Sequence, residues 1–164
     1  MEWIIAIAYA GALFFIFLFS MGQLHLTWHY LKGKKTENRD TPSFNNYPHI
    51  SVQLPIFNEK YVIERLIDSV VAIRYPKDKL EIQILDDSTD QTVEFIAAKV
   101  EEYTKKGIDI KHIQRKDRVG FKAGALKYGL ELAKGEFVAV FDADFLPKED
   151  FLEKTISHFQ DEQI

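Results

Sequence analysis

The strongest limit on the fold of this chain is an alternation of short apolar runs with longer amphipathic runs from residue 50 onwards. Four short runs rich in β-branched and aromatic residues predict strands, at 50–54, 80–85, 108–113 and 137–141. Each is followed by a run with helical spacing of its apolar residues, at 62–70, 88–103, 123–133 and 151–159. Strands that alternate with helices form parallel sheets covered by helices on both faces. We therefore expect an α/β fold with a parallel sheet.

Two polar segments are expected to begin helices. Ser88-Thr89-Asp90-Gln91 has the spacing of a capping box and is expected to start the second helix. Asn58 and Glu59 are candidates for capping the first helix.

The N-terminal stretch has a different character. From Trp3 to Leu31 there is no Asp, Glu, Lys or Arg, and the run exceeds the ~20 residues that a membrane-spanning helix needs. Trp3 at one end and Trp28 with Tyr30 at the other are typical of residues at membrane interfaces. We therefore expect a transmembrane anchor over residues 1–31.

A secretory signal peptide is the competing interpretation of this stretch. Such a peptide begins with positive charge, but only Glu2 precedes the apolar run here. Basic residues follow the run instead, at Lys32, Lys34, Lys35 and Arg39. They indicate that this end of the span faces the cytoplasm. The prediction is one span with the N-terminus outside, a cytoplasmic linker over 32–48 and a cytoplasmic domain over 49–164.

Composition excludes several classes of function. The chain has 21 basic and 25 acidic residues, and nearly all of them follow the span. This mildly acidic balance gives no support to nucleic-acid binding. The chain has no cysteine, so disulfides, thiol catalysis and cysteine-based zinc sites are excluded.

Polar side chains follow every predicted strand, at 55–59, 86–90, 115–122 and 142–144. In a parallel sheet the carboxyl ends of the strands lie along one edge, and ligands bind there. We therefore expect these four clusters to form one site.

Asp142 and Asp144 are the most informative pair, since two carboxylates two residues apart follow an apolar strand. Hard oxygen ligands of this kind suit Mg²⁺ or Mn²⁺, which bind ligand phosphates as well. The alternative is a solvated turn in which an aspartate caps the next helix, and the pair alone does not decide between the two.

The other clusters carry weaker signals. Asp86 and Asp87 could accept hydrogen bonds from a base or ribose, or Asp87 and Ser88 could merely cap the next helix. Arg115, Arg118 and Lys122 surround Gly120 ahead of a helix, where positive charge and free amides suit a diphosphate. A basic loop with glycines can equally be a plain surface loop.

Taken together, four segments resemble the cellulose synthase and cellulose-synthase-like branch of family 2 glycosyltransferases. They are VQLPIFNE at 52–59, ILDDSTD at 84–90, RVGFKAGAL at 118–126 and FDADFLP at 141–147. The sequences of the first two segments are most similar to those of the mannan and xyloglucan-backbone synthases.

The resemblance implies a Rossmann-like GT-A fold, of which 49–164 would be the N-terminal, nucleotide-binding half. It implies a nucleotide-diphosphate sugar donor, UDP-glucose or GDP-mannose, with UDP-glucose the more common, and inverting transfer to a glycan acceptor in β-glycan synthesis. The residues implied in donor binding are Glu59, Asp86, Asp87, Lys122 and Asp142. Asp142 and Asp144 would ligate the divalent cation.

In this family the general base comes from a later Thr-Glu-Asp-like segment, expected here beyond Ile164, so the resemblance implies an N-terminal fragment that is inactive alone. The alternative is a non-catalytic, membrane-tethered subunit that binds nucleotide sugars. A haloacid-dehalogenase-like phosphotransferase also places D-x-D after a strand. It fits poorly, because Leu146 and Pro147 stand where Thr or Val is expected and the motif follows the fourth strand.

Overall fold

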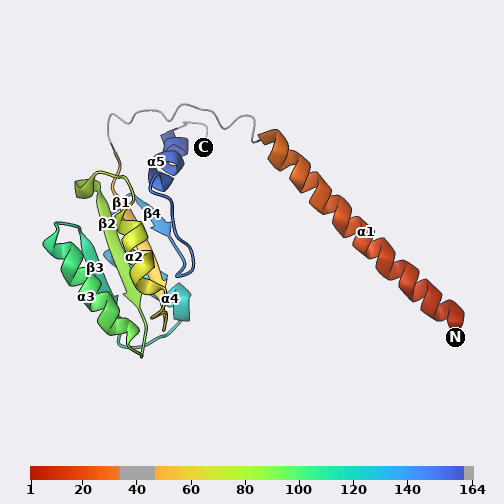
Figure 1. The fold of residues 1–164 in the computed structure, drawn as a ribbon, viewed down its shortest axis with the longest axis horizontal. Coiled ribbons are helices and arrows are strands. Elements are labelled where there is room, and N and C mark those ends of the chain that lie inside the picture. Colours follow the sequence, from red (N-terminus) through yellow and green to blue (C-terminus); the bar gives the residue numbers. More distant parts are fainter. Residues whose placement is uncertain (34–46, 161–164) are drawn as a thin grey trace. The chain divides into compact units, whose positions relative to one another are not determined.

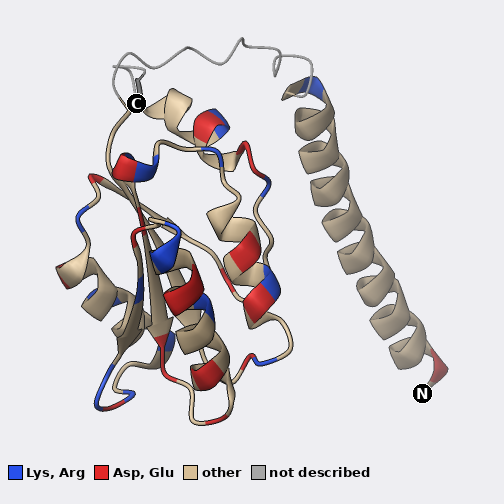
Figure 2. Ribbon diagram, turned by 60° about the vertical axis from the view of Figure 1, so that its left-hand side comes forward, with Lys and Arg blue, Asp and Glu red and all other residues tan. Residues whose placement is uncertain are grey.

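The computed structural model describes residues 1–33 and 47–160, and the chain divides into two units, residues 1–40 and 41–164. In the first unit, helix α1 runs from Glu2 to Gly33 without a bend (Figure 1). Its 32 residues correspond to about 48 Å at ~1.5 Å each. Figure 2 shows charged residues only at its two ends.

Length and composition make α1 the one helix of the described residues that is able to cross a membrane, and N-terminal signal sequences share these properties. Most of the predicted linker, residues 34–46, lies outside the described residues.

The second unit is built on a parallel four-stranded sheet with the order β3-β2-β1-β4 (Figure 1). The strands are β1 (Ile50–Ile56), β2 (Leu80–Asp86), β3 (Ile110–Gln114) and β4 (Phe137–Val140). The helices between and after them are α2 (Ile63–Val71), α3 (Thr92–Lys105), α4 (Phe121–Leu132) and α5 (Phe151–Ile156). Short 3-10 turns precede β2 (η2, Lys77–Lys79) and follow α5 (η3, Ser157–Gln160). The predicted α/β fold with a parallel sheet is confirmed.

One face of the sheet forms the hydrophobic core. Even-numbered residues of the central strands, such as Val52 and Ile82, point to this face and are fully buried. Helix α2 covers them with Leu66 and Ile67, and α3 adds Ile96. The apolar residues at every second position of β1 and β2 thus form the layer that α2 and α3 cover.

The opposite face is also buried but largely polar. Gln53 and Gln83 hydrogen-bond to each other at 3.0 Å beneath α4. The Ser51 hydroxyl donates to Glu81 at 2.6 Å, and Glu81 also accepts from Lys111 and from the backbone N–H of Lys134. These bonds satisfy the polar groups that the helix covers and fix the turn between α4 and β4.

Proline at position 55 is compatible with the central strand because of where the ladders end. The β1–β4 pairing stops at Gln53, whereas the β1–β2 pairing continues to Ile56. Pro55 therefore leaves no hydrogen bond to β4 unmade, and the strand extends past the predicted end at residue 54.

The capping prediction for the second helix is wrong. Helix α3 begins at Thr92, and the side chain of Asp90 accepts the N–H of Thr92 at 3.0 Å. The Ser88 hydroxyl instead accepts the N–H of Asn58 at 2.9 Å, so it ties two loops together. Asn58 does not cap α2 either, because the N-cap residue of α2 is Val62, and no side chain forms a capping hydrogen bond there.

Candidate functional site

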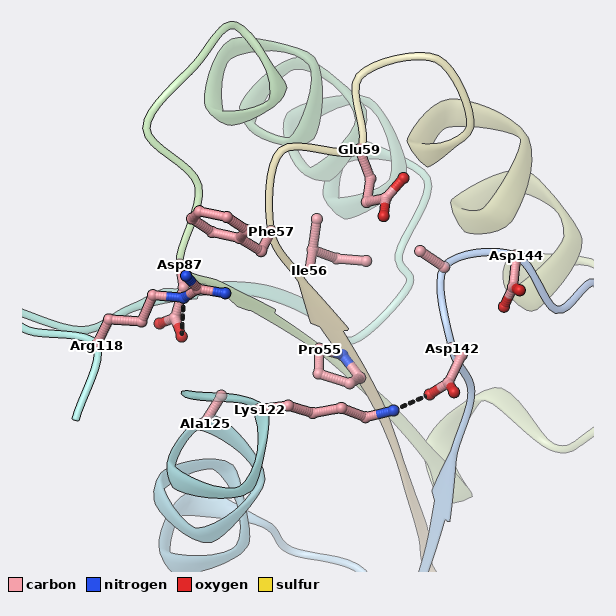
Figure 3. A pocket seen from close by; sticks show the side chains of 11 residues that line it. Pro55, Ile56, Phe57, Glu59, Asp87, Arg118, Lys122, Ala125, Asp142 and Asp144 are labelled. Atoms are coloured by element: carbon pink, nitrogen blue, oxygen red, sulfur yellow. Dashed lines mark hydrogen bonds and ion pairs between the residues drawn. The ribbon is translucent and has the colours of Figure 1, made fainter. Parts of the chain in front are cut away.

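A cavity of about 390 Å³ opens at the carboxyl edge of the sheet, where the ends of β1, β2 and β4 meet the start of α4. Figure 3 looks into it. Of the residues implied in donor or metal binding, five line this cavity, Glu59, Asp87, Lys122, Asp142 and Asp144, and so does Arg118 of the basic loop. Segments that are far apart in the sequence thus come together as the parallel topology requires.

Asp142 and Lys122 face each other across the cavity and form an ion pair (Figure 3). Asp142 lies two residues after the end of β4, and Lys122 lies in the first turn of α4. Asp144 lies two residues further on, in the same loop, and is exposed to solvent. Lys122 therefore lies next to the carboxylate of Asp142, and Asp144 adds a second carboxylate to the lining of the same cavity.

The cavity lining has more negative than positive charge. Its acidic residues are Glu59, Asp87, Asp142 and Asp144, against the basic Arg118 and Lys122, a difference of two negative charges. No group of three or more acidic, histidine or cysteine side chains that could hold a metal occurs in residues 1–33 or 47–160. The two carboxylates after β4 nevertheless suit a hard divalent cation that takes its other ligands from water and phosphate.

Asp87 is held from behind the cavity by Arg115. The Arg115 Nε donates to Oδ1 of Asp87 at 2.9 Å, and its Nη2 donates to Oδ2, which makes a two-pronged contact. The hydrogen bonds to the Asp87 carboxylate raise the pKa of Arg115 above its ordinary value. Arg115 itself does not line the cavity.

Arg118 and Phe57 form a second feature that the charge pattern alone does not reveal. The guanidinium carbon of Arg118 lies 3.3 Å from the centre of the Phe57 ring, a cation–π contact. Its Nε is 3.9 Å from Asp87, and all three residues line the cavity (Figure 3). Phe57 has no charge to mark it; its position directly after β1 is the one available signal.

Asp86 does not line the cavity. The residue is 2% exposed, and its side chain accepts bonds from the backbone N–H of Ser88 at 2.9 Å and from Gln114 at 3.4 Å. His112 Nε2 lies 2.8 Å from its Oδ2. The predicted role of Asp86 in donor binding stays a prediction, as do the roles of the residues that do line the cavity.

The loops after β1 and β2 are bonded to each other. Besides the bond to Ser88, the Asn58 side chain accepts the N–H of Thr89 at 2.9 Å, and Asn58 adopts a left-handed backbone with φ of 56°. Asparagine is one of the few residues that tolerates this conformation. Asn58 thus holds Phe57 and Glu59 at the cavity.

The sequence from residue 51 to residue 164 matches the family model described as "Glycosyl transferase family 2". Among curated proteins, glucomannan 4-beta-mannosyltransferase 2 of Arabidopsis thaliana is 44% identical over 116 residues, covering 68% of this chain and 22% of the relative. Glucomannan 4-beta-mannosyltransferase 1 of Cyamopsis tetragonoloba is 42% identical over 116 residues, with the same coverage of 68% and 22%.

Solved structures share the fold. The mannosyltransferase PcManGT from Pyrobaculum calidifontis, in complex with GDP-Man and Mn²⁺, has a TM-score of 0.67 and 29% identity, over 84% of this chain and 41% of that chain. S. aureus TarS 1–349 in complex with UDP-GlcNAc has a TM-score of 0.56 and 29% identity, over 70% and 32%.

The chain spans about a fifth of the length of the curated relatives that it matches, 22% in the two described above. The family match covers well over half of the chain, and it includes all four polar clusters at the sheet edge. The chain therefore belongs to glycosyl transferase family 2.

Proposed function

We propose that this chain forms the donor-binding part of a membrane-anchored glycosyltransferase that uses GDP-mannose in β-mannan or glucomannan synthesis. The observation that carries the proposal is the cavity at the sheet edge, where Asp142, Asp144 and two basic side chains converge. This set matches the chemistry of a sugar nucleotide, which presents a diphosphate with a divalent cation and a nucleoside at its other end.

The relatives favour GDP-mannose over UDP-glucose. The two curated relatives are named as mannosyltransferases, and PcManGT was solved with GDP-Man and Mn²⁺. TarS, the more distant structure by TM-score, was solved with UDP-GlcNAc. GDP-mannose therefore replaces UDP-glucose as the favoured donor.

In this proposal each side of the cavity has one task. Asp142 and Asp144 would hold Mn²⁺ or Mg²⁺, which stabilises the departing diphosphate. Lys122 and Arg118 would bind the diphosphate oxygens as charged donors. Glu59 and Asp87 would contact the nucleoside, and a Thr-Glu-Asp-like segment would supply the general base that completes inverting transfer to the glycan acceptor.

Helix α1 would anchor this unit to the lipid bilayer, with the donor site on the cytoplasmic side. Its uncharged length supports the anchor, and the basic residues that follow it in the sequence support the orientation.

The proposal is tested by donor binding to the full chain in detergent, measured by calorimetry with Mn²⁺ present. GDP-mannose should bind at least about ten-fold more tightly than UDP-glucose, because the two donors differ in both base and sugar contacts. Removing the cation with EDTA, or the substitution Asp144→Ala, should weaken GDP-mannose binding by about ten-fold or more, because the diphosphate loses a charged partner.

Asp78→Ala is the matched control. Asp78 is exposed in η2, ahead of the amino end of β2, and so lies at the other edge of the sheet from the cavity. Its loss should change the affinity by less than about two-fold. Binding that is insensitive to both EDTA and Asp144→Ala would refute the metal site, and tighter binding of UDP-glucose would refute the choice of donor.

A further inference from the structure

Arg115 stands out because it does not line the cavity, yet its side chain makes four hydrogen bonds. Its side chain is 11% exposed. Besides its two bonds to Asp87, Nη1 donates to the carbonyl of Val119 at 2.9 Å and Nη2 donates to the carbonyl of Phe121 at 3.1 Å. The guanidinium therefore joins the end of β2 to the loop that leads into α4.

The two carbonyls that Arg115 holds belong to residues next to Arg118 and Lys122, the two basic residues that line the cavity. Val119 directly follows Arg118, and Phe121 directly precedes Lys122. The turn between them is closed by the N–H of Phe121, which donates to the carbonyl of Arg118 at 3.0 Å. Fixing these two carbonyls fixes the backbone from which both cationic side chains extend.

This turn adopts a backbone that needs outside support. Gly120 has φ of 74°, and Phe121 has φ of 48°, in the left-handed region that an aromatic residue rarely adopts. Such strained conformations persist only where surrounding contacts determine them. The contacts from Arg115 to both sides of the turn supply that support.

The close approach of this loop to α4 requires glycine at position 124. A Cβ at Gly124 would lie 2.0 Å from the carbonyl oxygen of Val119 and 2.7 Å from Nη1 of Arg115. Glycine at this position lets the loop and the guanidinium lie directly against the first turn of α4, where the N–H of Gly124 also donates to the carbonyl of Gly120 at 2.9 Å.

We propose that Arg115 is a positioning residue for donor binding: through Asp87 and the carbonyls of Val119 and Phe121 it holds Arg118 and Lys122 in place for the diphosphate. The inference rests on the proposed function and adds a residue that touches neither donor nor metal. With the loop fixed in advance, the diphosphate does not have to order two long cationic side chains and their backbone when it binds.

Charge alone does not explain this role, since Lys at position 115 would keep the charge. A lysine ammonium is a point charge, whereas the planar guanidinium reaches a carboxylate and two carbonyls at once. A conservative substitution therefore separates positioning from electrostatics.

The experiment compares Arg115→Lys and Arg115→Ala with the wild-type full chain in detergent. GDP binding is measured by calorimetry and guanosine binding by saturation-transfer NMR, because guanosine lacks the diphosphate. Both variants should bind GDP about ten-fold or more weakly, in line with the loss of charged hydrogen bonds. Guanosine affinity should fall by a smaller factor, because guanosine lacks the diphosphate but still contacts Asp87, which Arg115 also holds. Lys116→Ala, an exposed neighbour in the same loop, is the control and should leave both affinities within about two-fold of the wild type.

Each result decides a separate question. An equal loss of GDP and guanosine binding, or a GDP affinity retained in Arg115→Lys, would overturn the positioning role. If Arg115→Ala does not fold, as judged by circular dichroism, Arg115→Lys gives the decision. A wild-type chain that binds neither ligand would overturn the proposed function instead.

Discussion

Asp86 and Asp87 are neighbours in the chain, but their side chains lie in different surroundings. Asp87 reaches the cavity and is paired with Arg115, whereas Asp86 turns inward and is bonded to Ser88, with His112 beside it. Successive side chains of a strand point to opposite faces, and this separates the two. One carboxylate thus lines the cavity, and the other links the ends of β2 and β3.

Burial alone would raise the pKa of Asp86, but the hydrogen bonds from His112 and Ser88 outweigh it and hold the pKa below its ordinary value. Because the folded pKa is lowered, ionised Asp86 stabilises the fold above about pH 4, the ordinary aspartate pKa, and this stabilisation is lost as the pH falls through the lowered pKa. Asp86→Asn should therefore lower the free energy of unfolding at pH 7 by about 1–3 kcal/mol.

Urea unfolding of the full chain at pH 7 and at pH 3 measures this effect. The difference between Asp86→Asn and the wild type should shrink as the pH is lowered, while Asp78→Asn, at an exposed position, should match the wild type at both. If the two free energies of unfolding differ as much at pH 3 as at pH 7, the ionised form of Asp86 contributes nothing to stability.

Single residues of the site were predictable to different degrees. Lys122 and Asp142 could be expected at one edge, because each lies beyond the end of a parallel strand. Arg115 could not be told from Arg118 in the sequence, since both are arginines of the same basic loop. Their different roles arise from a contact between residues 28 positions apart in the chain, which only the folded structure sets.

Among the elements, α4 shows how a helix without large buried side chains can be fixed on a sheet. Its buried residues are Ala125 and Gly129. They let the helix axis approach β1 and β2 closely, above Gln53 and Leu85. A helix was predicted at 123–133, but its small residues did not mark the contact face in the sequence, because a glycine in a helical run mainly weakens the helix prediction.

Substitutions at Gly129 should therefore be limited by packing and not by helix propensity. A Cβ there would lie 2.7 Å from a methyl carbon of Leu85 and 2.8 Å from Nε2 of Gln53, both on buried side chains. Alanine favours helix by about 1 kcal/mol over glycine, but overpacking costs about 1–3 kcal/mol. We expect Gly129→Ala to lower the free energy of unfolding by about 1 kcal/mol, and the larger Gly129→Val to lower it further.

The measurement is urea unfolding of the full chain, with the slope of the transition as a check that the unfolded states are comparable. Gly129→Ala more stable than the wild type would mean that helix propensity wins and that α4 has room to move off the sheet.

For the molecule as a whole, the alternation of strands and helices was enough to predict the sheet and its parallel direction. The polar layer beneath α4 was not predictable. Ser51, Gln53, Glu81 and Gln83 alternate with apolar residues in β1 and β2, a pattern that normally indicates a solvent-facing side. They are buried because they bond to one another and to the turn after α4, and these partners are distant in the sequence.

The basic residues near α1 predict how the chain is oriented in the membrane. Helix α1 has no basic residue before its apolar run, and Lys32, Lys34, Lys35 and Arg39 follow it. Positive charge near a span is retained in the cytoplasm, so a reporter fused after Ile164 should be active only if it works in the cytoplasm. Fluorescent protein and alkaline phosphatase fusions measure this directly.

Moving the charge should invert the result: substitution of these four residues by Gln, together with Lys at positions 2 and 3, should raise phosphatase activity, because orientation follows the basic residues. Phosphatase activity in the unchanged chain would contradict the orientation. Release of the fusion into the soluble fraction after cleavage near Gly33 would show that α1 acts as a signal sequence and not as an anchor.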